Sequence, residues 1–338
     1  MLALSGGIMS DALIQVQNLV KEFPVRRGLF EHGQDKGTTP VVHAVDDISF
    51  SIAKGEVLGL AGESGSGKST TGRLLLRLLD PTAGKILYAG RDLATATQEE
   101  MRRLRPHMQV VFQDPNGSLN PRMTIGEAIS HPLEIHGIMK PSDRKDFVIS
   151  LMEKVGLTPA DFIYRKYPHQ ISGGQCQRVV IARALVTSPE FLVADEPIAM
   201  ADVSVRALVM ELLKKLKDEM GMTYLFITHD LATAKYLCDR VAIMYLGRIV
   251  EIGSKKTLFS NPHHPYTRAL LQAVPVPDPA KRRTHEVVRG EIPSAINPPA
   301  GCHFHPRCQY ARPDCSGTRP PLRDIGDGHF SACLFDNQ

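Results

Sequence analysis

Residues 62–70 read GESGSGKST and carry the residue types and spacing of a phosphate-binding loop. The glycines let the backbone turn around an anion, so that successive N–H groups point inward. Lys68 can then reach the β- and γ-phosphates, and the Ser69 hydroxyl can ligate Mg²⁺. The apolar residues 57–61 predict a short buried strand before the loop, and residues 71–79 predict an amphipathic helix after it. This segment therefore predicts a binding site for a nucleoside triphosphate.

Two acidic residues follow directly on a second apolar run, residues 191–194, which predicts another buried strand. Ligands bind at the carboxyl ends of strands in open α/β sheets. Asp195 is placed there to hold Mg²⁺, directly or through water, and Glu196 to orient and deprotonate an attacking water. Alternatively, Asp195 and Glu196 cap the next helix. However, burying two carboxylates directly after four apolar residues costs free energy unless a cation is bound. We therefore favour a catalytic role.

The segment Ser172-Gly173-Gly174-Gln175 precedes a helical pattern that contains Arg178, Arg183 and several apolar residues. Ser172 can cap this helix, and the glycines leave the first N–H groups bare for an anion. In isolation such a segment is typical of an ordinary helix start. Its position between a phosphate-binding loop and a strand that ends in two acids favours a functional role.

The elements that must position these residues alternate between strands and helices, which predicts a largely parallel α/β sheet. Beyond Gly253 prolines become frequent, and four of the six cysteines lie past residue 301, so we interpret residues 254–338 as a separate carboxy-terminal extension. We expect strands at 14–23, 41–52, 57–61, 85–88, 109–113, 191–194 and 223–227, helices at 71–79 and about 205–220, a surface loop at 28–40 and a mainly helical region at 114–189.

The composition of the 338-residue chain sets limits on its class. A hydrophobic fraction of 43% and a charged fraction of 22% are ordinary for a globular protein. A formal net charge of +4 with scattered basic residues does not favour a nucleic-acid partner. No apolar run approaches the length of a membrane span, and no secretion signal is visible at the amino terminus. We expect a cytosolic chain with reduced or metal-bound cysteines, whose membrane role would come through a partner.

The order of these motifs resembles the ATP-binding cassette (ABC) superfamily over about residues 14–253. The resemblance implies an α/β fold: a P-loop NTPase core with a RecA-like mixed or parallel sheet, an antiparallel β-subdomain and a helical subdomain at about 114–189. Residues 1–253 would form the nucleotide-binding domain, with a small Cys- and Pro-rich extension behind it. The implied activity is ATP hydrolysis to ADP and phosphate.

The resemblance also implies a role for each residue that matches a motif of the superfamily. Phe23 would stack on adenine, His229 would grip the γ-phosphate, and Gln113 would touch Mg²⁺ and the attacking water. Catalysis is implied for Glu196, His229 and Gln113, and Mg²⁺ binding for Ser69, Gln113 and Asp195. Nucleotide contacts are implied for Phe23, Gly62, Ser64, Gly65, Gly67, Lys68, Ser69, Thr70, Ser172, Gly173, Gly174, Gln175 and Asp202.

In this superfamily the segment that matches Ser172 to Gln175 contacts the γ-phosphate of an ATP molecule bound to a second subunit. Two ATP molecules would therefore hold two subunits together as a dimer, and closure of this dimer would perform mechanical work. Two departures from the usual pattern stand out. Residues 199–201 replace the usual Ser-Ala-Leu before Asp202, which affects an inter-subunit contact. Cys176 stands where a longer polar residue is usual.

Segments outside the core are similar to the ATPases of dipeptide, oligopeptide and nickel importers. They are residues 113–124, 167–170, 261–271 and 297–302. The resemblance implies a sister ATPase as partner, two integral membrane permeases, an extracytoplasmic substrate-binding protein and no nucleic acid. The chain would lie peripherally on the cytoplasmic face of the inner (cell) membrane. The solute stays open between peptides, nickel and related compounds, because its selectivity would reside in the partners.

The extension holds Cys302, Cys308, Cys315 and Cys333, whose spacing is not the paired C-x-x-C of a zinc ribbon. A short proline-rich segment has little core of its own, so four thiols suit a metal. The resemblance allows a [4Fe–4S] cluster here. Zinc with help from a neighbouring histidine, and plain reduced cysteines, are the alternatives.

Two other classes of protein are weighed against an importer subunit. A soluble ABC ATPase that acts on ribosomes or nucleic acid usually carries two cassettes or a coiled-coil or zinc insertion, and this chain has one motif set and neither insertion. A metal- or redox-sensing ATPase would use the cysteines of the extension. Co-purification with permeases, or a brown colour near 400 nm, would discriminate among these.

Overall fold

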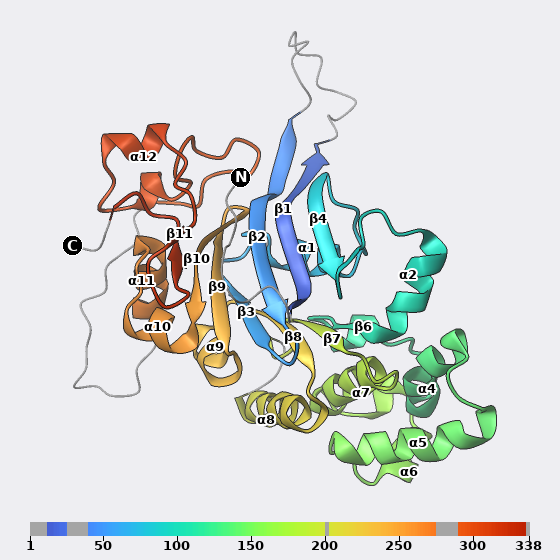
Figure 1. Ribbon diagram of the computed structural model, residues 1–338. Coiled ribbons are helices and arrows are strands. Elements are labelled where there is room, and N and C mark those ends of the chain that lie inside the picture. The colour runs from blue at the N-terminus through green and yellow to red at the C-terminus, as the bar shows by residue number, and fades with distance from the viewer. Residues whose placement is uncertain (1–11, 26–39, 200–202, 275–289, 336–338) are drawn as a thin grey trace, which may run out of the picture. The chain divides into compact units, whose positions relative to one another are not determined.

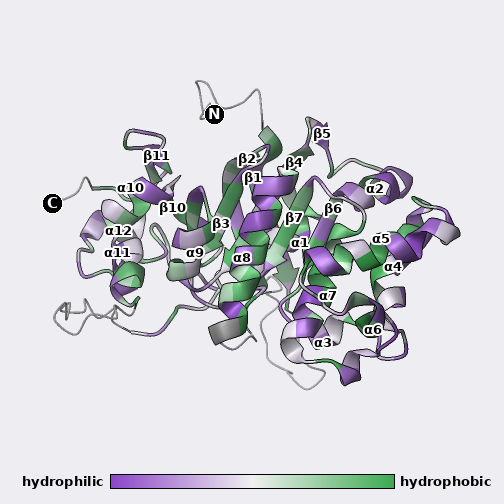
Figure 2. Cartoon of the chain, turned by 90° about the horizontal axis from the view of Figure 1, so that it is seen from below, coloured by the Kyte–Doolittle hydropathy of each residue, from purple (hydrophilic) through white to green (hydrophobic). Residues whose placement is uncertain are grey.

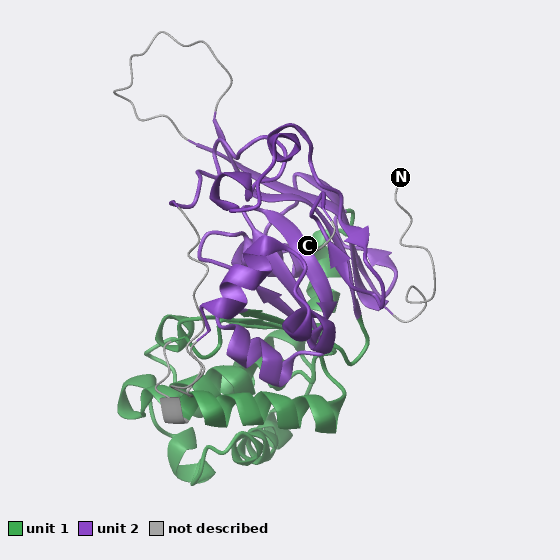
Figure 3. Ribbon diagram, turned by 90° about the vertical axis from the view of Figure 1, so that its left-hand side faces the viewer, with its two compact units in different colours: residues 1–11, 53–57, 95–227 green, residues 12–52, 58–94, 228–338 purple. Residues whose placement is uncertain are grey.

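The structure is a computed structural model that describes residues 12–25, 40–199, 203–274 and 290–335. The chain divides into two compact units, coloured separately in Figure 3. Of the described residues, unit 1 holds 53–57, 95–199 and 203–227, and unit 2 holds 12–25, 40–52, 58–94, 228–274 and 290–335.

Unit 1 contains three neighbouring parallel strands, β6 (Met108–Val111), β7 (Phe191–Asp195) and β8 (Thr223–Thr228). All five residues of β7 are buried, and Figure 2 shows this strand in the hydrophobic colour. β6 ends two residues before Gln113, the last residue of the predicted strand, and Gln113 is exposed. The parallel pairing brings the carboxyl ends of these strands to one edge, where Asp195 lies.

Four helices of unit 1, namely α2, α3, α4 and α7, begin at a side chain that caps the first turn. Thr124 and Glu127 form a capping box at the start of α4, and Gly137 ends this helix in the left-handed conformation, with φ 61°. Helix α4 packs against α5, α6 and α7, which confirms the predicted helical region. The helices are α2 (Gln98–Leu104), α3 (Pro115–Ser118), α4 (Ile125–His136), α5 (Pro141–Lys154), α6 (Ala160–Tyr164), α7 (Gly173–Leu185) and α8 (Val203–Met220), with 3₁₀ turns at Arg105–His107 and Pro168–Gln170.

Unit 2 contains a four-stranded sheet in the order β2-β1-β4-β5, seen on the blue side of Figure 1. β1 pairs antiparallel with β4, and β4 pairs antiparallel with β5. Ile14 and Val16 of β1 are buried with the partly exposed Gln15 between them, and a register shift between Gln17 and Val20 then interrupts this alternation. The strands are β1 (Ala12–Pro24), β2 (Val41–Ala53), β4 (Ala83–Tyr88) and β5 (Arg91–Asp92).

The remaining strands of unit 2 lie in the order β3-β9-β10-β12-β11, with β3 parallel to β9 and the other neighbours antiparallel. Because β12 pairs with β10, the segment after Gly253 returns to this sheet; Figure 1 shows α10 and α11 beside β10. The strands are β3 (Val57–Ala61), β9 (Arg240–Tyr245), β10 (Arg248–Ser254), β11 (Arg323–Asp324) and β12 (Phe330–Ser331). The helices are α1 (Lys68–Leu75), α9 (Leu231–Leu237), α10 (Lys255–Ser260), α11 (Pro265–Gln272), the 3₁₀ turn η4 (His305–Arg307) and α12 (Pro313–Gly317).

A buried carboxylate attaches the C-terminal segment to β10. Glu251 is 0% exposed and accepts hydrogen bonds from the backbone N–H groups of His263 (2.7 Å) and His264 (2.8 Å) and from His329 Nε2 (2.7 Å). These bonds fix the start of α11 and the turn before β12 to the same strand. Burial acts to raise the pKa of Glu251, but the hydrogen bonds outweigh it, and the pKa is lowered.

Most predicted bounds differ from the observed ones by one or two residues, and the largest difference, at the first helix, has a clear cause. The first helix spans Lys68–Leu75 rather than 71–79, because Arg77 takes a left-handed φ of 47° and its guanidinium bonds to Asp80 and the Leu93 carbonyl. Most of the predicted loop at 28–40 lies outside the described residues. Within the described part of the chain, no helix is both long and apolar enough to span a bilayer.

Candidate nucleotide site

The predicted phosphate-binding loop lies between β3 and α1 in unit 2, with its lysine folded back over it. Lys68 Nζ donates to the carbonyl oxygens of Gly62 and Glu63, both at 2.8 Å, and lies 3.3 Å from Ser66 Oγ. Lys68 is only 5% exposed. These bonds fix the ammonium group against the loop that precedes it.

Three glycines give this loop its path. Gly62, Gly65 and Gly67 have φ angles of 155°, 78° and 105°, a range that other residues rarely adopt. A Cβ atom at Gly62 or Gly67 would collide with the carbonyl oxygen of Met244 or Ala44, whereas a Cβ at Gly65 would meet nothing within 4 Å. Other residues of unit 2 therefore pack tightly against the loop at Gly62 and Gly67, whereas the space beside Gly65 is open.

Helix α1 begins directly behind the loop, and no side chain caps its first turn at Gly67. Its first N–H groups and its positive dipole end suit an anion. Ser69 and Thr70 lie half-buried on this turn, and Ser64 is exposed on the loop. A glycine cradle, an uncapped helix start, a buried ammonium and a hydroxyl group form a donor set that fits a nucleoside triphosphate with Mg²⁺.

In unit 1 the structure brings two predicted catalytic residues together. Gln113 Nε2 donates to Glu196 Oε2 at 3.2 Å. Asp195, the last residue of β7, is 6% exposed, and Glu196 directly behind it has a positive φ of 46°. Non-glycine residues in this conformation are strained and are frequent at functional sites. The Glu196 N–H donates to the Ile227 carbonyl at 3.0 Å, which holds the strained turn in place.

The Ser172 segment begins α7 as predicted. Ser172 Oγ accepts from the Gln175 N–H at 3.3 Å, and the Ser172 N–H donates to Gln175 Oε1 at 3.0 Å. Ser172 and Gly173 are exposed, and a Cβ at Gly173 would meet nothing within 4 Å. A Cβ at Gly174 would press on Val205, so only one of the two glycines is constrained by packing. The side chains of Ser172 and Gln175 therefore satisfy backbone N–H groups at this helix start. Ser172 and Gly173 nevertheless lie at the surface of the chain.

Three further predicted residues are described by their own surroundings or lie outside the described residues. Phe23 is half-buried at the end of β1, where the Lys21 ammonium lies 5.0 Å from its ring centroid. His229 is exposed on the turn between β8 and α9, which is held by the bond from the Asp230 N–H to Thr228 Oγ1 at 3.0 Å. Asp202 lies outside the described residues.

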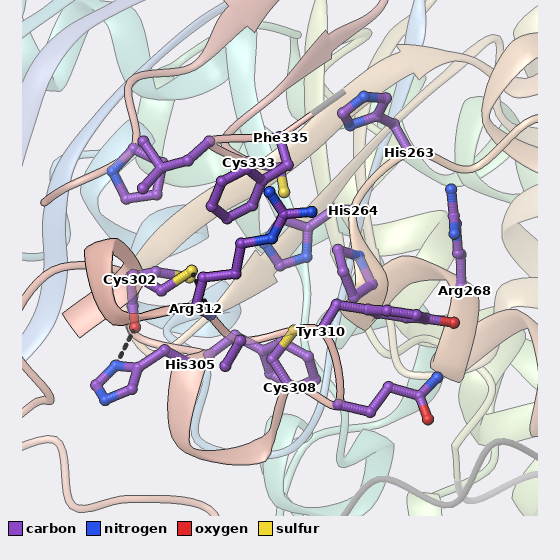
Figure 4. Close-up of a pocket in the computed structure, with 17 residues that line it drawn as sticks. His263, His264, Arg268, Cys302, His305, Cys308, Tyr310, Arg312, Cys333 and Phe335 are labelled. Atoms are coloured by element: carbon purple, nitrogen blue, oxygen red, sulfur yellow. Dashed lines mark hydrogen bonds between the residues drawn. The ribbon is translucent and has the colours of Figure 1, made fainter. Parts of the chain in front are cut away.

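The four cysteines of the C-terminal segment line one cavity of about 290 Å³ in unit 2. Figure 4 shows Cys302, Cys308 and Cys333 around it, with the Arg312 side chain among them. Burial raises the pKa of Cys302 to about 11, and it also raises the pKa values of Cys308 and Cys333. These groups are therefore thiols at neutral pH.

The prediction of an iron–sulfur cluster is not supported. Across the described residues, which include all four cysteines, no group of three His, Cys, Asp or Glu side chains could hold a metal ion. The Arg312 guanidinium, 4.1 Å from the Phe335 ring centroid, adds positive charge to the lining of this cavity.

Sequence reasoning missed the partners of Glu63, a residue inside the phosphate-binding loop. Its carboxylate pairs with Arg307 at 2.8 Å and 3.3 Å, and its N–H donates to Tyr266 Oη at 3.0 Å. Both partners belong to the C-terminal segment. No local pattern could have signalled a contact between residues 244 positions apart.

Comparison with known proteins identifies the family. The ABC transporter family profile matches residues 45–199, and that of the oligopeptide/dipeptide transporter C-terminal region matches residues 250–315. A putative peptide import ATP-binding protein of Brucella ovis is 52% identical over 311 residues, which cover 92% of this chain and 97% of the relative. The oligopeptide transport ATP-binding protein AppF of Bacillus subtilis is 44% identical and covers 96% and 97%.

A solved structure agrees with these sequence matches. It is a dimeric ATP-binding cassette in a post-hydrolysis state bound to ADP and Pi, 28% identical, with a TM-score of 0.62 over 72% of this chain and 98% of that one. The predicted ABC-type P-loop fold is confirmed. The chain belongs to the ATP-binding proteins of the ABC transporter family that carry the oligopeptide/dipeptide transporter C-terminal region.

Proposed function

We propose that this chain is the ATP-hydrolysing subunit of an importer that takes up di- or oligopeptides. The observation that carries the proposal is a buried lysine folded over a glycine loop at an uncapped helix start, in a chain 52% identical to a peptide import ATP-binding protein. The alternatives of a ribosome- or nucleic-acid-acting ATPase and of a metal or redox sensor have no such support.

In this proposal the loop and the first turn of α1 bind the triphosphate. The N–H groups from Gly65 to Thr70 would surround the β-phosphate, and Lys68 would turn from its backbone carbonyls to the phosphate oxygens. Ser69 and Asp195 would hold Mg²⁺, which when bound neutralises charge on the β- and γ-phosphates. Phe23 would lie against adenine.

Glu196 is the proposed general base, which takes the proton of the attacking water at one of its carboxylate oxygens. The hydrogen bond from Gln113 orients this carboxylate and adds a polar contact for the same water. The positive φ of Glu196 fixes the direction of its side chain. His229 would contact the γ-phosphate. Little covalent chemistry is needed, because positioning and charge stabilisation supply most of the rate in phosphoryl transfer.

The exposed start of α7 supports a site completed by a second ATPase subunit. Ser172 and Gly173 are open to the surface, and an anion at this helix start would belong to a neighbouring chain. Asp202 would contribute to the same contact. A sister ATPase is the proposed partner. ATP would favour the closed pair and hydrolysis would remove that preference, so closure performs work on the attached permeases.

The proposed assembly holds two integral membrane permeases and an extracytoplasmic substrate-binding protein besides the ATPases. The chain would lie on the cytoplasmic face of the cell membrane. The names of the relatives favour peptides over nickel as the solute.

The test is ATP-driven uptake in vesicles. The tagged chain is isolated from membranes with the proteins that co-purify, reconstituted, and supplied with ATP on its own side and labelled di- and oligopeptides on the other. We expect uptake with the wild type and none with Glu196→Gln. Glu190→Gln is the matched control, since Glu190 precedes β7 and its side chain is 48% exposed. Isolation with ribosomes instead of permeases, without peptide uptake, would refute the proposal.

A further inference from the structure

The phosphate-binding loop is bonded to the C-terminal segment at one residue, Glu63. All three of its polar groups are engaged. The carboxylate receives two bonds from Arg307, the N–H donates to Tyr266 Oη, and the carbonyl accepts from Lys68 Nζ at 2.8 Å. Glu63 therefore connects the lysine of the loop to two residues that lie more than 200 positions away.

Most of the side chains that make these contacts are buried. Tyr266 is 0% exposed and its ring centroid lies 4.7 Å from that of Tyr245 and 5.3 Å from that of Phe304. The Arg307 side chain is 8% exposed and lies over the Tyr245 ring, with its central carbon 5.8 Å from the centroid. Solvent and salt screen such a pair weakly, and its geometry is bidentate.

The turn that carries Arg307 is held by its own backbone hydrogen bonds. The N–H of Arg307 donates to the Phe304 carbonyl at 3.0 Å, and the N–H of Cys308 donates to the His305 carbonyl at 3.2 Å. Phe304 is 2% exposed in the aromatic cluster with Tyr245 and Tyr266. The guanidinium is therefore presented to Glu63 by a preformed structure, which lowers the entropic cost of holding the loop.

The charge of Glu63 gives this pairing a consequence for nucleotide binding. A carboxylate in a loop that receives a triphosphate repels the ligand, and the repulsion grows with the number of phosphates. Arg307 neutralises the carboxylate at hydrogen-bonding distance. Without Arg307 the anion would be left half-buried, beside the lysine that must contact phosphate.

We propose that Arg307 and Tyr266 are positioning residues of the phosphate-binding loop, through which the C-terminal segment sets the affinity for nucleotide phosphates. Neither residue is required to touch the nucleotide. Arg307 cancels the charge of Glu63, and Tyr266 holds the Glu63 N–H so that the loop keeps its path. The inference rests on the proposed function of residues 62–70.

The test measures dissociation constants of the purified full chain for MgATP, MgADP and AMP by calorimetry. Arg307→Met should weaken MgATP binding on the order of tenfold, MgADP binding less and AMP binding least. Glu63→Gln in the same chain should restore MgATP binding to within about threefold of wild type, because the uncompensated charge is gone. Tyr266→Phe, which keeps the ring, should weaken binding several-fold.

Arg319→Met is the matched control. Arg319 lies in the same C-terminal segment and pairs with Asp46 and Asp47 at 3.6 Å and 3.2 Å, and not with Glu63. It should leave all three dissociation constants unchanged. An equal loss for all three nucleotides with Arg307→Met, no rescue by Glu63→Gln, or unaltered MgATP binding would overturn the inference.

Lys68→Ala separates failure of the inference from failure of the proposed function. If Lys68→Ala abolishes MgATP binding and Arg307→Met has no effect, only the role of the C-terminal segment is wrong. If Lys68→Ala binds MgATP like wild type, the proposed role of the loop itself is wrong. The unfolding temperature of each variant without nucleotide shows whether a weaker affinity merely reflects a damaged fold.

Discussion

Replacing Glu251 by glutamine should destabilise unit 2 far more than an ordinary surface change. The carboxylate accepts from His263 N–H and His329 Nε2 at one oxygen and from His264 N–H at the other. Glutamine keeps the volume but has one acceptor oxygen, so even in its better orientation its NH₂ group faces one buried N–H donor.

The expected cost follows from these three bonds. One buried donor left unsatisfied costs about 1–3 kcal/mol, and two charge-assisted bonds that become neutral lose about 1 kcal/mol each. The lower desolvation penalty of a neutral amide offsets part of this sum. We expect a net loss of roughly 3 kcal/mol, which lowers the unfolding temperature by about 6–12 °C for a unit of this size.

Thermal unfolding followed by circular dichroism at pH 7 measures this shift. Glu134→Gln is the control, because the Glu134 side chain is 67% exposed and lies 3.9 Å from His131, and it should change the unfolding temperature little. An unfolding temperature of Glu251→Gln within about 1 °C of wild type would refute the reasoning, since it would mean that the buried acceptors contribute nothing net.

Three further predictions follow from packing and titration. Burial lowers the pKa of His264 to about 4 from 6.5, so only the unfolded chain gains this proton as pH falls from 6.5 to 4. The unfolding temperature of the wild type should therefore fall as the pH is lowered from 6.5 to 4, and that of His264→Asn should fall less steeply. An equal dependence of the unfolding temperature on pH in both chains would contradict this prediction. Gly126→Ala should lower the free energy of unfolding by about 1–3 kcal/mol, because a Cβ there collides with the Tyr164 ring. Adding Tyr164→Leu to the same chain should recover part of this loss, as measured by urea unfolding. Iodoacetamide labelling of Cys302, followed by mass spectrometry, should accelerate about tenfold per pH unit between 7 and 9, given its pKa of about 11; stoichiometric iron or zinc in the preparation would contradict free thiols.

The nucleotide loop and its flanking elements could be predicted because their signals are local. A glycine string between an apolar run and an amphipathic run specifies strand, loop and helix within about twenty residues. The capping role of Ser172 and the position of Asp195 at a strand end were predictable for the same reason, and both are confirmed.

Contacts between residues that are far apart in the sequence were not predicted. The end of α1 depends on Arg77 and its bond to the Leu93 carbonyl, and the anchoring of the C-terminal segment depends on Glu251 and His329, 78 positions apart. A single sequence carries no signal for such pairs. The predicted cluster is not supported for a related reason: cysteine spacing indicates that thiols can gather, but it does not specify how closely they approach one another.

ATP hydrolysis by the assembled complex with Glu196→Gln tests the central claim most directly. If Glu196 is the general base that Gln113 orients, MgATP should still bind, while the hydrolysis rate should fall by about 100-fold or more. Bound ATP should accumulate and hold the ATPase subunits together. Turnover equal to that of wild type, measured as phosphate release at saturating MgATP, would contradict the account.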